Sequence, residues 1–459
     1  MPVYRYISYN KIEKSVEFYR KREDMIKRDK YIAKLIDSKN NGFPKVVTGV
    51  RRCGKSYLLT DMFYNHLRED GVREECILII DLDSDKNANL RTPIELGNYV
   101  RHYCSGKKNC YVILDEIQRV DTIINPSYTG GEIVLAKTND KNTISFVDVI
   151  LGLSKEKNID LYVTGSNSKM LSSDIVTEFR DKATNIHLMP LSFEEFYEYV
   201  GGSKTEAIYE YMQYGGMPLS VLKKSSEKKD YLRGLFNTTY FKDIIEHNHM
   251  KKSEALDELC NILSSCVGQP INSKRIADTY KSVTKKNIDD ETATRYINFF
   301  VDAFLLNEVK RYDVKGRKEI GAQRKYYFVD TGLRNARLDF VFPDEGQLIE
   351  NTIYNELIYN GYSVNVGTYE AVGKDENGKS IRTSYEIDFY AKRDNRIYYI
   401  QACADISDAR TKNREVKAFN LLSDPIEKIL VVNKPILETR DESGYTIISL
   451  PDFLLEYIK

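Results

Sequence analysis

The chain has 459 residues, a length that corresponds to about three ordinary domains. Hydrophobic residues make up 42% and charged residues 30%, as in globular proteins with buried cores. The 68 basic and 68 acidic residues cancel, so attraction to nucleic acid or to an anionic membrane has to come from local patches. The seven cysteines form no CxxC pair, which argues against a disulfide framework or a zinc site. With neither a signal peptide nor an apolar run of ~20 residues, we expect a cytoplasmic protein without membrane contact.

The first half of the chain alternates between strand-like and helical patterns. Residues 12–38 carry apolar side chains at helical spacing and predict an amphipathic helical lead-in over 1–40. Four β-branched runs follow, at 45–50, 76–82, 111–116 and 161–166. Near-continuous apolar strands between helices predict an α/β fold with a parallel sheet buried on both faces, here over 41–200. The Gly-, Asn- and Thr-rich stretch 122–144 predicts a surface insertion, and 201–250 is expected to be a helical lid or linker.

Two further modules are expected after residue 250. Helical patterns near 256–263, at 273–280 and at 289–306 precede two strand-like runs that a turn at 315–318 separates. Three helices followed by a β-hairpin form the winged-helix pattern, expected over 251–340. Beyond it, a helix (346–359) and strands near 361–369, 384–391, 396–403 and 427–432, with a second helix at 411–422, predict an α/β domain over 341–459.

GVRRCGKS at 49–56 matches the GxxxxGK[ST] motif, between an apolar strand and a helical stretch. Gly49 and Gly54 allow backbone amides to close around phosphates, and the start of the next helix directs further amides at the same charge. We expect Lys55 to bridge β- and γ-phosphate oxygens and the Ser56 hydroxyl to coordinate Mg²⁺. The rest of the expected nucleotide-binding loop is Val50, Arg51, Arg52, Cys53 and Tyr57.

The strand YVILDE ends in two adjacent carboxylates. Asp115 is positioned to hold the magnesium ion through water, and Glu116 to orient or deprotonate the attacking water. A pair of exposed carboxylates at a strand end is the alternative. Because parallel sheets bind ligands at this edge, the sequence favours hydrolysis over passive binding.

The next strand ends in the polar run TGSNS, where a side chain could sense the γ-phosphate. We assign this role to Asn167, while capping of a following helix by Ser166 or Ser168 is an alternative that does not exclude it. Arg180 could reach a phosphate as an arginine finger. An ordinary surface arginine is an equally good interpretation.

GVRRCGKSYLL, ILDEIQ, VTGSNSKMLSSDIVTEFR, PLSFEEF, YGGMP and YFKDIIE resemble blocks of bacterial and archaeal AAA-type ATPases that carry a winged helix and a C-terminal domain of unknown function. The resemblance extends from near residue 30 to the end. It implies an ASCE-type P-loop core with ATP and magnesium, although the residues alone do not distinguish ATP from GTP. It carries over to Lys55, Ser56, Asp115 and Glu116, and more loosely to Asn167.

The chain departs from this pattern at one point. The family usually continues TEFR with Gly-Arg, where this chain has Asp181-Lys182, so the resemblance leaves Arg180 as the candidate finger. Rings of such ATPases complete each site with an arginine from the neighbouring subunit. The resemblance therefore also allows a homo-oligomer.

The expected winged helix could bind DNA or a protein. Residues 251–340 hold 17 lysines and arginines against 13 acids, and the hairpin gathers basic residues suited to phosphate: Lys310, Arg311, Lys315, Arg317, Lys318, Arg324 and Lys325. However, the helix that would enter a groove begins with Asp289, Asp290 and Glu291, and its other face is apolar.

Residues 386–403 predict an acid-bearing β-hairpin, with Glu350 on the preceding helix. This resembles the restriction-endonuclease-like core, where a helix Glu, a strand Asp and an E-x-K pair hold metal and activate water. Glu350 and Asp388 match, but the E-x-K positions hold Gln401 and Cys403. Gln is a weaker Mg²⁺ ligand, and Cys supplies no cation. We therefore expect a degenerate nuclease fold that binds a partner.

The leading hypothesis is a magnesium-dependent AAA-type ATPase whose nucleotide state controls how the C-terminal half engages DNA or a partner. An ATP-gated, metal-dependent nuclease and a signalling switch that docks a protein without DNA are the alternatives.

Overall fold

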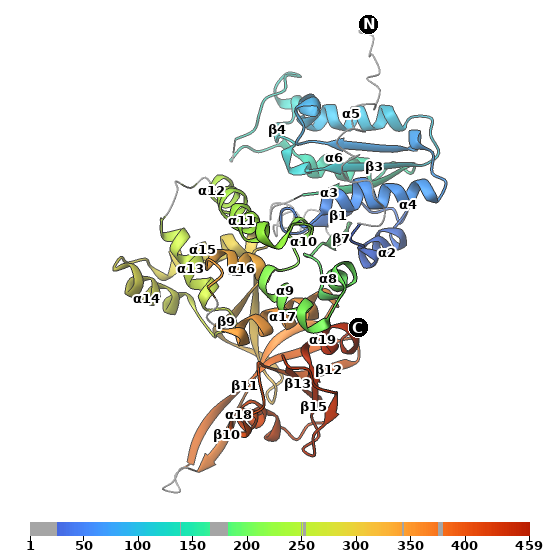
Figure 1. The fold of residues 1–459 in the computed structure, drawn as a ribbon. Helices are drawn as coiled ribbons and strands as arrows, with labels where there is room; N and C mark the ends of the chain where they lie inside the picture. Colours follow the sequence, from blue (N-terminus) through green and yellow to red (C-terminus); the bar gives the residue numbers. More distant parts are fainter. Residues whose placement is uncertain are drawn as a thin grey trace.

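The computed structural model describes residues 25–137, 139–165, 182–248, 250, 254–341, 344–374 and 380–459 (Figure 1). Of the expected helical lead-in, the described part forms α2 (Asp29–Asp37). All seven cysteines are free thiols. Among the described residues, no helix combines the length and apolar character that a membrane crossing requires.

A five-stranded parallel sheet forms the N-terminal part of the molecule, in the order β2-β3-β6-β1-β7. Its strands are β1 (Lys45–Thr48), β2 (Ile77–Asp81), β3 (Cys110–Asp115), β6 (Ile159–Thr164) and β7 (Thr184–His187). The first four confirm the predicted apolar runs. The edge strand β7 was missed because only one of its four residues is buried, so its sequence, TNIH, gives no strand signal.

Helices cover both faces of this sheet, as expected for a parallel sheet. One face packs against α5 (Pro93–Cys104) and α6 (Phe146–Leu153). The other packs against α2 and the helix that runs through α3 (Lys55–Tyr57), η3 (Leu58–Phe63) and α4 (Tyr64–Glu69) (Figure 1). The stretch predicted as an insertion forms the short antiparallel pair β4 (Ile123–Ile124) and β5 (Thr143–Ile144).

The middle of the chain is helical, as predicted, and lies between the two sheets of the molecule (Figure 1). Its elements are α8 (Phe193–Val200), α9 (Lys204–Tyr214), α10 (Pro218–Val221), α11 (Ser225–Leu235), η9 (Phe236–Tyr240) and α12 (Phe241–His247). The three helices of the expected winged helix follow as α13 (Glu254–Ser265), α14 (Ser273–Thr284) and α15 (Asp290–Asp302).

The hairpin after α15 belongs to a larger sheet. Its strands, β8 (Leu306–Asp313) and β9 (Lys318–Phe328), are antiparallel, and β8 also pairs in parallel with β10 of the C-terminal region. The result is one eight-stranded sheet in the order β14-β15-β13-β12-β11-β10-β8-β9. The boundary expected at residue 340 therefore runs through a continuous sheet.

The remaining elements complete this C-terminal half. Its further strands are β10 (Ser363–Lys374), β11 (Ser380–Arg393), β12 (Arg396–Cys403), β13 (Glu427–Val432), β14 (Thr439–Arg440) and β15 (Thr446–Ser449). Its helices are α16 (Thr331–Arg337), α17 (Glu345–Tyr359), α18 (Ala409–Asn420), α19 (Leu450–Asp452) and η10 (Phe453–Tyr457). The β10–β11 ribbon projects away from the body (Figure 1).

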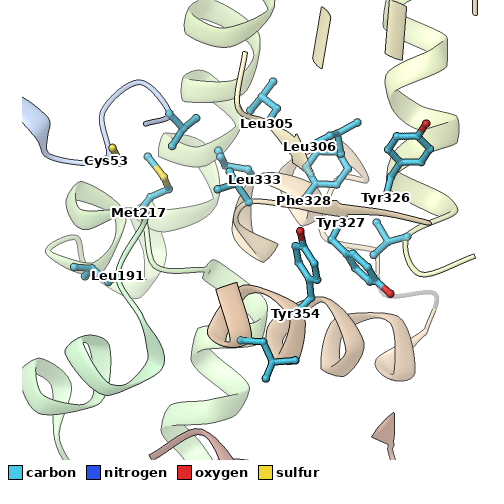
Figure 2. Close-up of a cluster of buried hydrophobic side chains, with 14 of the residues drawn as sticks. Cys53, Leu191, Met217, Leu305, Leu306, Tyr326, Tyr327, Phe328, Leu333 and Tyr354 are labelled. Atoms are coloured by element: carbon cyan, nitrogen blue, oxygen red, sulfur yellow. The ribbon is translucent and has the colours of Figure 1, made fainter. Parts of the chain in front are cut away.

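One hydrophobic core joins the two halves. It runs from α2 and the loop after β1, through the helical middle, to Ile458. Figure 2 shows Cys53 of that loop beside Met217, with Leu333 and Phe328 beyond them. The loop after β1 thus packs against the same core as the C-terminal half.

A buried carboxyl lies where α17 meets the helical middle. The Glu356 Oε1 accepts hydrogen bonds from the Phe193 amide at 2.6 Å and from the Tyr211 hydroxyl at 3.1 Å. Burial raises the pKa of Glu356 to about 8. The folded chain therefore retains this proton at a pH at which the unfolded chain has lost it.

This carboxyl makes stability depend on pH. Between its ordinary pKa of 4.5 and about 8, the folded state binds the extra proton, so stability falls as pH rises through this window. Glu356→Gln removes the ionisation and keeps an oxygen acceptor. We expect a flatter pH dependence and, at pH 8, a melting temperature about 2–4 °C above that of the wild type. Thermal unfolding from pH 5 to pH 8 measures this, with Glu206→Gln on the exposed face of α9 as control; parallel curves for wild type and Glu356→Gln would contradict it.

Candidate nucleotide-binding site

The loop between β1 and α3 has a backbone that only particular residues allow. Gly49 has φ 140° and Gly54 has φ 101°, both in the region that favours glycine. A Cβ built on Gly49 would lie 2.1 Å from the Leu188 carbonyl oxygen. The first glycine of the motif is therefore required by the chain that follows β7, at Leu188.

Lys55 points back into this loop. Its Nζ donates to the carbonyl oxygens of Gly49 and Val50, both at 3.0 Å, and the residue is only 4% exposed. Because the loop carbonyls alone neutralise this buried cation poorly, a phosphate entering the loop would be a strong competitor for it.

Ser56 and Asp115 lie together at the carboxyl end of the sheet. The Ser56 side chain lies close enough to the Asp115 carboxylate to lower its pKa, and Thr164 at the end of β6 donates its hydroxyl to the same carboxylate. Burial raises the pKa of Asp115, and these two side chains oppose the shift. The two residues predicted to share a magnesium ion are thus in contact.

Glu116 occupies a strained backbone position directly after β3. Its φ of 55° is left-handed, which is uncommon for a residue with a side chain. Its amide donates to the Thr164 hydroxyl at 3.0 Å, and its carboxylate accepts a hydrogen bond from the Gln118 side chain. Thr164 and Gln118 therefore position the pair of acids that the sequence singled out.

The other loop residues connect the site to the helical middle. The Arg51 guanidinium lies 2.6 Å from both carboxylate oxygens of Asp243 on α12, and the Tyr240 hydroxyl donates to the Arg51 carbonyl at 2.6 Å. Cys53 is buried and donates its thiol to the Leu188 carbonyl, Val50 is buried, and Tyr57 is 37% exposed. Arg52 has a left-handed φ of 63°.

Two predicted residues lie outside the described part of the chain. Asn167 and Arg180 fall within 166–181, so the sensor and the arginine finger stay predictions. Thr164, by contrast, is buried and contacts both acids. Its position at the end of β6 was visible in the sequence. Tyr240 and Asp243 lie in the YFKDIIE block, but nothing in the sequence links them to the loop, because they reach it from about 190 residues away.

This site and sheet define a nucleotide-binding P-loop domain. Residues 41–197 match the family model described as an AAA domain. Residues 205–343 match a domain of unknown function, DUF8612, which spans the helical middle and the expected winged helix.

Two relatives align with most of the chain. An uncharacterized protein of Haemophilus influenzae is 28% identical over 438 residues, 94% of this chain and 99% of the relative. The uncharacterized protein MJ1544 of Methanocaldococcus jannaschii is 27% identical over 445 residues, 94% of this chain and 89% of the relative.

Among solved structures, the chain is similar to the Aeropyrum pernix ORC2 protein in its ADPNP and ADP complexes. The identity is 10% and the TM-score is 0.34, and the match covers 78% of this chain and 96% of that one. It is also similar to AMPPCP-bound DnaA from Aquifex aeolicus, with 14% identity, a TM-score of 0.29, and coverage of 58% and 84%. At these scores neither likeness bears on function.

The close approach at Gly49 gives a direct test of the loop. Gly49→Ala forces a Cβ onto the Leu188 carbonyl, so we expect lost ATP-analogue binding and a stability loss larger than the about 1 kcal/mol of left-handed strain alone. Gly71→Ala is the matched control, because Gly71 has φ 83° and open space around it. Thermal unfolding and analogue titration measure both variants. Equal behaviour would show that the contact at Gly49 is unimportant.

Proposed function

We propose that this protein is a magnesium-dependent ATPase whose nucleotide state controls how its C-terminal half engages a partner. The observation that carries the proposal is the meeting of Lys55, Ser56 and Asp115 at one end of the parallel sheet. A phosphate-binding loop, a hydroxyl and a carboxylate in contact are the groups that a magnesium-bound triphosphate requires.

The donor set fits magnesium. Ser56 and Asp115 offer the hard oxygen ligands that this ion prefers, and the two side chains are close enough to serve one ion. A bound magnesium ion would neutralise phosphate charge and hold the β- and γ-phosphates in place. Its charge would also favour the ionised form of Asp115, whose pKa burial raises.

Glu116 is the residue proposed to take the proton of the attacking water. Glu116 directly follows Asp115 in the chain, and its backbone amide is held by the Thr164 hydroxyl. The Gln118 side chain holds the carboxylate in this structure, so the orientation of Glu116 depends on that hydrogen bond. Lys55 would leave the Gly49 and Val50 carbonyls to bind the β- and γ-phosphates.

Two variants test hydrolysis. Lys55→Ala is expected to lose ATP binding, because the loop then lacks its only buried ammonium. Glu116→Gln is expected to keep binding and to lose turnover by about 100-fold or more, because an amide cannot accept the proton. Phosphate release with Mg²⁺ and binding of a fluorescent ATP analogue are measured for both. Wild-type rates in both variants would end the proposal.

The route from nucleotide to C-terminal half passes through α12. Arg51 and its carbonyl oxygen are held by Asp243 and Tyr240, so a movement of the loop would act directly on this helix. A second connection to the C-terminal half is Asp330, which caps α16 through the Leu333 amide at 2.9 Å and accepts the Gly216 amide at 2.6 Å. These contacts join the loop, the helical middle and the C-terminal half.

Removing the Arg51–Asp243 ion pair tests this coupling. In Asp243→Asn we expect ATP-analogue binding to persist. The change in hydrogen exchange that the analogue causes in α11, α12 and α16 is expected to shrink, which corresponds to a loss of about 1–2 kcal/mol of coupling free energy. Asp230→Asn is the control, since Asp230 pairs with Arg233 on α11. An exchange response like that of the wild type would rule out this route.

The state of three of the hairpin's seven basic residues supports proposing a protein, rather than DNA, as the partner. Of the hairpin's basic residues, Lys310 pairs with Glu319 and Arg324 with Glu308, each at 3.0 Å, and Lys325 is buried. Grouping Lys325 with the phosphate-binding cations was therefore wrong. Because β8 lies between β9 and β10, this hairpin is also not a separate wing.

A further inference from the structure

A single buried ammonium lies among three carboxylates in the C-terminal half. Lys325 of β9 is 2% exposed, and its Nζ lies 2.8 Å from Glu350 Oε1 and 2.9 Å from Glu386 Oε1. Its distance to Asp388 Oδ1 is 3.7 Å. Glu350 comes from α17, and the other two acids come from β11. This is the cluster that the sequence compared with a nuclease centre.

The same carboxylates have further partners within the fold. The Tyr327 hydroxyl donates to Glu350 Oε1 at 2.5 Å, and the Ala402 amide donates to Asp388 Oδ2 at 2.9 Å. A Cβ on Gly268 would lie 2.7 Å from Glu350 Oε2, so the loop after α13 closes that side. Oxygens of Glu350 and Asp388 are thus held by protein groups.

Gln401 occupies the position where a nuclease has its third acid. Its Oε1 accepts the Asp388 amide at 3.4 Å, and its Nε2 donates to Glu415 Oε2 at 3.4 Å. The side chain therefore participates in hydrogen bonds that do not need a cation. Among the described residues, no group of three or more His, Cys, Asp or Glu is arranged to hold a metal.

The charges are consistent with an internal cation. Burial alone would lower the pKa of Lys325, but the charges of Glu350, Asp388 and Glu386 raise it above its ordinary value. Burial, followed by the charge of Glu350, raises the pKa of Asp388 to about 8. The Lys325 ammonium thus already balances part of the negative charge that these carboxyl groups would offer a dication.

We infer that Lys325 supplies the cation of this cluster in place of a metal ion, so that Glu350, Glu386 and Asp388 lock β9 to α17 and β11 and form no metal-dependent nuclease centre. The lysine missing from the E-x-K position is thus present in space, contributed by a different strand. The lock also fixes the β8–β9 hairpin to the C-terminal sheet, so the two move as one body. This inference does not depend on the nucleotide site.

Metal binding to the full chain without nucleotide tests the inference. Mn²⁺ is titrated into the wild type and Asp388→Asn, and binding is followed by electron paramagnetic resonance. We expect the same Mn²⁺ binding in both proteins, because Asp388 contributes to no metal site. Supercoiled plasmid with Mg²⁺ or Mn²⁺ is expected to stay intact. A wild-type Mn²⁺ site, or plasmid cleavage, that Asp388→Asn abolishes would overturn the inference.

The Lys325→Ala variant, in contrast to the wild type, is expected to bind a metal ion at this cluster. Removing the ammonium leaves buried carboxylates unpaired, so we expect the melting temperature to fall by roughly 5 °C or more. Mn²⁺ is then expected to bind in the vacated position and restore part of the loss, and the double variant with Asp388→Asn is expected to lose that response.

Lys310→Ala is the matched control, because Lys310 forms an exposed ion pair on the same hairpin, worth little stability. A Lys325→Ala protein as stable as this control, and without a Mn²⁺ response, would overturn the inference. If Lys325→Ala does not fold, the comparison of wild type with Asp388→Asn decides alone.

Discussion

The parallel alignment of β1, β3 and β6 is the constraint on which the nucleotide site depends. Because these strands run in one direction, their carboxyl ends meet at one edge and bring Ser56, Asp115 and Thr164 into contact. The loop after β1 can lie there only because Gly49 tolerates the Leu188 carbonyl. Sheet order and one glycine thus fix the place of the phosphate-binding loop before any ligand is present.

The sequence predicts this part well because each signal is local. The motif at 49–56 needs only its neighbouring strand and helix, and Asp115 follows directly from an apolar run. Thr164 and Asn167 are both polar residues near the same strand end, so the sequence alone does not separate their roles. Only the position of the Thr164 hydroxyl, between the Glu116 amide and the Asp115 carboxylate, distinguishes Thr164 in space.

The C-terminal half shows why local signals are insufficient. β12 and β13 match the expected ranges, whereas β10 and β11 extend beyond theirs. Their arrangement was not predicted, because β8 pairs in parallel with β10, a strand more than fifty residues further along the chain. That pairing carries β9 into the same sheet and turns Lys325 from an apparent surface cation into the partner of Glu350. Sequence composition does not reveal which strands pair with each other.

The contacts that connect the two halves therefore differ in their solvent exposure. At the loop, the Arg51–Asp243 pair is about one-third exposed on both sides, so it can break and re-form at low cost. Further along, Asp330, Glu356 and Lys325 are almost fully buried, and breaking their hydrogen bonds would leave polar groups without water. A nucleotide-driven change is thus expected to occur at the exposed link and to move the C-terminal half as a unit, because the buried links resist separation.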